Sequence, residues 1–186
     1  MNDFDPVRRR RDHLLVLLWA LLFAKCFILE YCIAAYEVPV NSLVYVWGLS
    51  LFMATAASIV YVNLTCEAQG GIAIRTRSGR VWVACLALVL VLVLSSLVFG
   101  WIGLAPLTVV VSVLFAIAYA AQYLYHREKS AMCCAAGWCL CAGMLLQMSS
   151  PAVLLLFGIS LIALAAFPSF LVYLRLRHLA SGVMPG

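Results

Sequence analysis

Long apolar runs alternate with short polar breaks along most of the chain. Each run has roughly the 20 residues that a helix needs to cross the hydrocarbon core of a bilayer. Charged residues, prolines and glycines bound the runs. The pattern therefore predicts an all-α, polytopic membrane helix bundle that forms a single integral membrane domain over residues 1–186. The six predicted transmembrane helices cover residues 14–36, 43–64, 81–99, 104–125, 131–148 and 152–174.

The breaks between the runs carry recognisable helix-ending and helix-starting residues. Glu37 and Pro39 close the first run, and Asn41 can cap the start of the second. The one long polar segment, residues 65–80, is predicted to be a loop. Pro151 follows two serines and predicts a tight turn before the last helix.

Composition leads to the same class of protein. Of 186 residues, 67% are hydrophobic and only 10% are charged, and the mean hydropathy is +1.11. A typical soluble domain is about half apolar and about a quarter charged. A chain of this size could not bury so much apolar surface in a water-soluble core, so lipid must solvate most of it. The predicted spans leave no room for a separate soluble domain.

The basic residues predict the orientation. Every lysine and arginine except Lys25 lies before the first span or after the second, fourth or sixth: Arg8–Arg11, Arg75, Arg77, Arg80, Arg127, Lys129, Arg175 and Arg177. The positive-inside rule then predicts cytoplasmic termini, a cytoplasmic 65–80 loop, and a bacterial-type inner (plasma) membrane. Arg75, Arg77 and Arg80 are predicted to contact anionic lipid headgroups, unless they only determine topology.

Catalytic signatures are absent from the sequence. It contains no G-x-S-x-G, H-E-x-x-H, C-x-x-C or phosphate-binding glycine motif. Glu67 and Glu128 are isolated, whereas a membrane-embedded lipid-processing enzyme needs clustered carboxylates or histidines. The sequence therefore predicts no catalytic residues, no cofactor, no metal and no nucleic-acid partner, and it favours a non-enzymatic role.

Small residues recur along the fifth predicted span. Cys133, Gly137 and Cys141 follow one another at intervals of four, and Gly143 belongs to a second such row. Small residues at this spacing let helix backbones approach closely in a membrane, so this span is predicted to be tightly packed. A metal or redox role for the cysteines is the alternative, but a third and a fourth ligand have no obvious place.

Pro168 lies inside the sixth predicted span. A proline there removes one helical hydrogen bond and frees the carbonyl of Leu164. The residue is predicted to be either a structural kink or a hinge of the kind that broken helices provide in transporters.

Lys25 and Glu30 are the two ionisable residues deep inside the first span. An ionisable group at this depth is a functional hypothesis by default, because its burial in hydrocarbon is costly. Five helical positions separate the two side chains by about 140°, so they are not expected to pair within the helix. Three partners remain for this functional polar pair: a second copy of the chain, a different protein, or a hydrated cavity that holds a solute. The alternative without a function is a lysine that extends toward the headgroups and a locally hydrated glutamate.

Two functions follow as the main alternatives. The first is a transport or solute-binding bundle, and the second is a non-catalytic accessory subunit of a larger membrane complex; a lipid-processing enzyme is a distant third. The predicted partners are membrane lipids, with either a second copy of the chain (a homo-oligomer) or a partner membrane protein. The format is similar to that of the substrate-binding subunits of energy-coupling-factor vitamin transporters, which dock a partner through A-x-x-x-A on span one. Ala20 and Ala24 fit that spacing, but it is common in apolar helices and assigns no family.

Overall fold

The computed structural model describes residues 6–66, 77–99, 103–148 and 151–180, and these residues are almost entirely helical. Some helices continue directly into one another through short π-helical segments, which are labelled η. The elements are α1 (Pro6–Tyr36), η1 (Leu43–Gly48), α2 (Leu49–Cys66), α3 (Arg77–Phe99), α4 (Leu104–His126), α5 (Lys129–Leu146), α6 (Ala152–Leu161), η3 (Ile162–Ala166) and α7 (Phe167–Ala180). The described part of the chain contains no strand.

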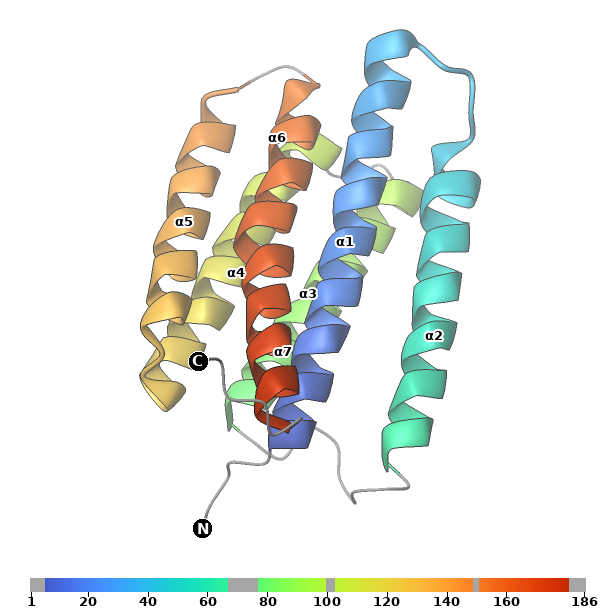
Figure 1. Ribbon diagram of the computed structural model, residues 1–186. Coiled ribbons are helices and arrows are strands. Elements are labelled where there is room, and N and C mark those ends of the chain that lie inside the picture. The colour runs from blue at the N-terminus through green and yellow to red at the C-terminus, as the bar shows by residue number, and fades with distance from the viewer. Residues whose placement is uncertain (1–5, 67–76, 100–102, 149–150, 181–186) are drawn as a thin grey trace.

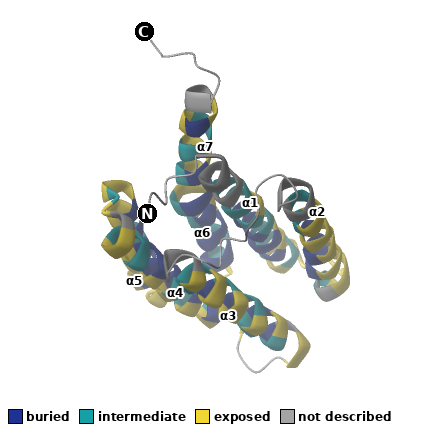
Figure 2. Ribbon diagram, turned by 90° about the horizontal axis from the view of Figure 1, so that it is seen from below, coloured by how far each residue is buried: buried dark blue, intermediate teal, exposed yellow. Residues whose placement is uncertain are grey.

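Successive helices run up and down in a bundle (Figure 1). The start of α1 and the end of α7 lie at one end of the bundle, and the end of α1 and the start of α6 lie at the other. α1 packs against the continuous helix α6–η3–α7, while α4 packs against α3 and α5. α2 lies at the edge of the bundle and packs mainly against α1 (Figures 1 and 2).

Five helical stretches are long and apolar enough to cross a membrane, which confirms the prediction of an all-α chain of membrane type. They are His13–Tyr36, Val44–Tyr61, Ala105–Tyr125, Lys129–Leu146 and Ala152–Arg177. The apolar part of α3, Arg80–Ser96, is shorter than these within the described residues. Helices nevertheless occupy all six ranges that the sequence predicted.

Two predicted boundaries differ from the structure. α1 begins at Pro6, so the arginine run is already helical rather than a leader before the helix. α2 continues to Cys66 and α3 begins at Arg77, so the predicted loop at residues 65–80 is helical at both ends. In both places the helix continues past the apolar run, because arginine, serine and threonine can all be accommodated in an end turn.

A row of aromatic rings crosses the centre of the bundle. Phe27 of α1 packs edge-on against Trp47 and Phe157, with ring centroids 5.2 and 4.7 Å apart. Trp138 of α5 continues the row, 5.9 Å from Phe157 and 5.0 Å from Phe115. Four of these residues are at most 1% exposed, so the row joins η1, α1, α6, α5 and α4 into one core.

The backbones of α1 and α6 approach each other closely. A Cβ added at Gly158 would come within 3.1 Å of the Ala24 carbonyl oxygen and 2.7 Å of an Ile28 side-chain carbon. Ala20 and Ala24 are both buried. Ala24 of the A-x-x-x-A spacing therefore packs inside the chain against α6, where Gly158 has no Cβ to keep the backbones apart.

Candidate functional site on the α1–α2 face

Glu30 lies inside the bundle with a neutral partner. Its side chain is 7% exposed, and its Oε1 accepts a 2.7 Å hydrogen bond from the indole Nε1 of Trp47. Trp47 is fully buried. An indole N–H can only donate, so the carboxylate is the acceptor that lets Trp47 be buried in the core.

The π-helical segment η1 positions Trp47. Its widened turn is marked by the Leu49 N–H, which bonds the Val44 carbonyl five residues earlier. The Val46 carbonyl in the same turn accepts a 3.6 Å contact from the Cys26 thiol of α1. Single π turns are rare and often occur at functional sites. Here the turn directs both the indole and a backbone oxygen toward α1.

Lys25 has the opposite placement and lies on the outer surface of the bundle. Its side chain is exposed, and its Nζ donates a 2.7 Å hydrogen bond to Oγ of Ser50, which is itself buried. Lys25 is twelve residues from His13 and eleven from Tyr36, the ends of the apolar stretch. At 1.5 Å per residue the ammonium therefore lies about 16 to 18 Å from either boundary, too deep for its own stem to reach water.

A third polar contact joins the same two helices. The Trp19 Nε1 of α1 donates a 3.1 Å hydrogen bond to the Ser58 hydroxyl of α2. Together with the Lys25–Ser50 and Trp47–Glu30 contacts, it gives polar links at three depths along one helix pair. Because apolar surface gains little by leaving lipid for protein, such hydrogen bonds are a main source of helix association in membranes. They hold the peripheral α2 against α1.

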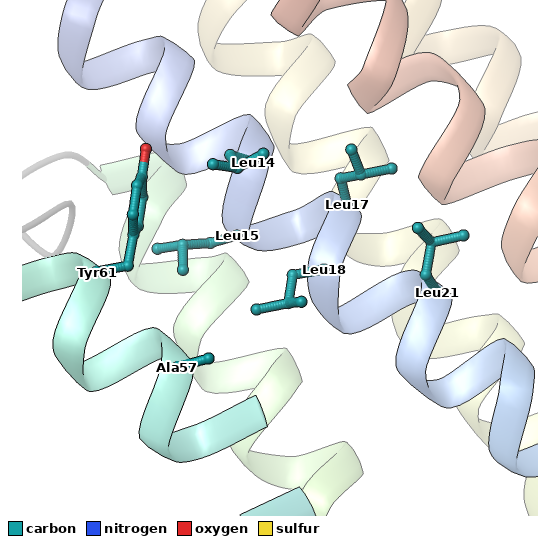
Figure 3. A pocket seen from close by; sticks show the side chains of 7 residues that line it. All are labelled: Leu14, Leu15, Leu17, Leu18, Leu21, Ala57 and Tyr61. Carbon is teal, nitrogen blue, oxygen red and sulfur yellow. The ribbon is translucent and has the colours of Figure 1, made fainter. Parts of the chain in front are cut away.

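Beside these links the two helices leave an apolar groove (Figure 3). Its volume is about 410 Å³, and it opens to the outside of the bundle. Leu14, Leu18 and Leu21 lie on the same face of α1 as Lys25, at helical spacings of four, three and four. The groove therefore runs along α1 toward Lys25, which lies at the middle of the span. Its lining residues are Leu14, Leu15, Leu17, Leu18, Leu21, Ala57 and Tyr61.

The residues predicted to pack span five differ in how far they are buried. Cys133 is exposed, Gly137 is half-buried, and Cys141 is buried. A Cβ at Gly137 would meet the flexible Leu164 side chain at 2.8 Å, whereas one at Gly143 would have no neighbour within 4 Å. Gly143 therefore makes no close contact with another helix among the described residues, and Gly137 approaches only the Leu164 side chain.

The Cys141 thiol belongs to a small polar cluster between α4, α5 and α6. It lies 3.3 Å from the Ser160 hydroxyl and 3.9 Å from the Ser112 hydroxyl. Both serines also donate to backbone carbonyls of their own helices, of Leu156 and Thr108. Within the described residues, no group of three or more His, Cys, Asp or Glu side chains is arranged to hold a metal ion.

Pro168 follows a second π-helical turn. The Phe167 N–H bonds the Ile162 carbonyl, five residues earlier, at the end of η3. Proline lacks the N–H that would reach the Leu164 carbonyl, and its ring crowds that oxygen. A widened turn just before the proline relieves this crowding, so α6, η3 and α7 continue as one helix across it.

Of the three arginines predicted to contact lipid headgroups, Arg80 is exposed near the start of α3. Arg77 begins that helix, and Arg75 lies outside the described residues. A polar network that the sequence analysis missed lies at the same end of the bundle. Trp82 Nε1 donates to the Gln122 side-chain oxygen at 3.1 Å, and the Gln122 amide donates to the Glu128 carboxylate at 3.2 Å.

Comparison with known protein families, with curated proteins and with solved structures yields no match to this chain.

Proposed function

We propose that the protein is a non-catalytic accessory subunit of a larger membrane complex, and that it holds its partner through the α1–α2 face. The observation that carries the proposal is Lys25: a cation at the middle of a membrane helix, exposed on the outside of the bundle, with one hydroxyl as its hydrogen-bond partner. A central lysine costs about 2.5–3.5 kcal/mol on insertion scales. A partner that supplies an acceptor would lower that cost.

The proposal includes the topology. The chain crosses an inner (plasma) membrane six times, with α3 as the shortest span and both termini in the cytoplasm. The start of α1, the start of α3, the end of α4 and the end of α7 carry the arginines and lie at one end of the bundle. The positive-inside rule assigns that end to the cytoplasm.

Solute transport, the other main expectation, has less support from the geometry. Apart from the α1–α2 groove, the best-defined hollow among the described residues is about 250 Å³ and lies between α5 and α6. Both hollows are lined mainly by apolar side chains and open sideways from the bundle. A path for a polar solute would need converging polar groups inside the bundle, whereas Glu30 is committed to Trp47.

The test is the mass of the complex extracted in mild detergent from the cells that naturally make the protein. The tagged wild-type chain of 20.4 kDa should run in a stoichiometric complex, and Lys25→Met should run as the free chain. Leu29→Met, at an exposed neighbour on the same helix, should keep the complex. A Lys25→Met complex of unchanged size, or a wild-type chain that runs alone, would refute the accessory role.

A further inference from the structure

Among the described residues, no carboxylate lies beside Lys25. Glu30, the one carboxylate at membrane depth in the described residues, is 7% exposed and bonded to Trp47. Glu37 lies twelve residues further along the chain, just past the end of α1, and twelve residues of helical rise are about 18 Å. The part of the chain that the structure describes therefore places no carboxylate beside Lys25, and we infer that the counter-charge comes from another molecule.

A second copy would not supply it either. Any copy of the chain brings the same Glu30, buried beneath Trp47 in its own core. Pairing across a twofold interface would require that core to open. The partner is therefore a different molecule with a carboxylate of its own in the middle of the membrane.

The surface next to Lys25 along α1 is the apolar α1–α2 groove. Leu14, Leu18 and Leu21 extend the lysine's face toward the basic end, and the small Ala57 forms the facing wall (Figure 3). Small residues let another helix approach closely. The apolar lining suits an apolar helix, and Lys25 lies one helical turn beyond Leu21, the last leucine of the groove along α1.

We propose that the α1–α2 groove binds a single transmembrane helix of a different protein, and that an Asp or Glu at the middle of that helix pairs with Lys25 beside Ser50. This deepens the proposed accessory role and rests on it. The groove accommodates the partner helix, and the pair with Lys25 fixes the position of that helix along the groove. Sliding the helix by one turn would move its carboxylate about 5.4 Å away from the ammonium.

The probe is a tagged single-span helix of leucine and alanine with one glutamate at mid-length, reconstituted with the full chain in lipid nanodiscs. Binding is followed by energy transfer between labels on the two components. Lys25→Met should weaken binding by about 3- to 30-fold, the range expected for one interhelical polar contact. Lys129→Met, the same substitution at the exposed lysine that begins α5, should leave binding unchanged.

Two further pairs of measurements separate charge from shape. A Lys25→Glu chain should bind a probe with a central lysine better than the glutamate probe. Ala57→Phe, which fills the groove without touching Lys25, should abolish binding, while Ala56→Phe at the adjacent exposed position outside the groove should not. Equal binding of the glutamate probe by wild type and Lys25→Met, or no effect of Ala57→Phe, would overturn the inference.

The two proposals can fail separately. If the natural complex depends on Lys25 but the glutamate probe does not bind, the accessory role stands. The proposal that the groove binds a helix with a central carboxylate is then wrong. If the natural complex keeps its size when Lys25 is replaced by Met, the proposed accessory role is itself wrong.

Discussion

Lys25 and Glu30 are five residues apart on one helix, yet they have opposite environments. Sequence alone indicated that they would not pair, because five helical positions turn them about 140° apart. It could not indicate which of them faces inward, since α1 is apolar on all sides and gives no periodic signal. The decisive information is tertiary: Trp47 needs an acceptor, and Glu30 is the group that η1 brings it to.

The Glu30–Trp47 bond should contribute measurably to stability. Glu30→Leu leaves a buried indole N–H without its acceptor and should destabilise the fold by about 1–3 kcal/mol. Glu30→Gln keeps an acceptor oxygen in place and should lose much less. Thermal unfolding in detergent would distinguish the two variants, and a Glu30→Leu protein that melts like the parent would show that the bond is dispensable.

Among the elements, the six predicted apolar ranges all contain helices, because hydrophobic run length is a strong local signal. The π-helical turns had no such signal. η3 follows from Pro168 and η1 from contacts with α1, and neither type of turn changes the apolar pattern. α5 was expected to be among the most closely packed helices, and it packs extensively against α4. A close approach that the sequence did not indicate lies between α1 and α6 at Gly158, a glycine that resembled an isolated small residue.

Glycine substitutions can test this packing. Gly158→Ala should destabilise the bundle by about 1–3 kcal/mol, because the new methyl meets the Ala24 carbonyl oxygen as well as the Ile28 side chain, and the backbone oxygen cannot move aside. Gly143→Ala should cost nothing, since its surroundings are open and alanine favours a helix by up to about 1 kcal/mol. Equal melting temperatures for the two variants in detergent would contradict the close α1–α6 approach.

Over the whole molecule, α2 stands apart from the other helices. It is fixed to α1 by polar contacts at three depths and leaves a groove beside them. The central aromatic row joins α1, α4, α5 and α6, and Trp47 of η1 connects the α2 span to that row. A bundle with one edge helix held by polar bonds presents a surface to the membrane that differs from its remaining apolar faces.

The topology can be checked independently of any partner. Reporter domains fused after Cys66 or His126 should be active as cytoplasmic fusions, and those fused after Tyr36 or Leu146 as external ones. The reason is the concentration of arginines at one end of the bundle. The reverse pattern would place the arginine-rich end outside and refute the six-span orientation.

The central claim is that the α1–α2 face contacts a partner protein. The most direct measurement is photo-crosslinking in the native complex. A photoreactive amino acid is placed at Leu21, which lines the groove and is 46% exposed. The control position is Leu140 of α5, which is 71% exposed. The account predicts a discrete protein adduct from Leu21 that disappears in the Lys25→Met background, and none from Leu140. An adduct from Leu140 alone, or a Leu21 adduct that persists without Lys25, would contradict it.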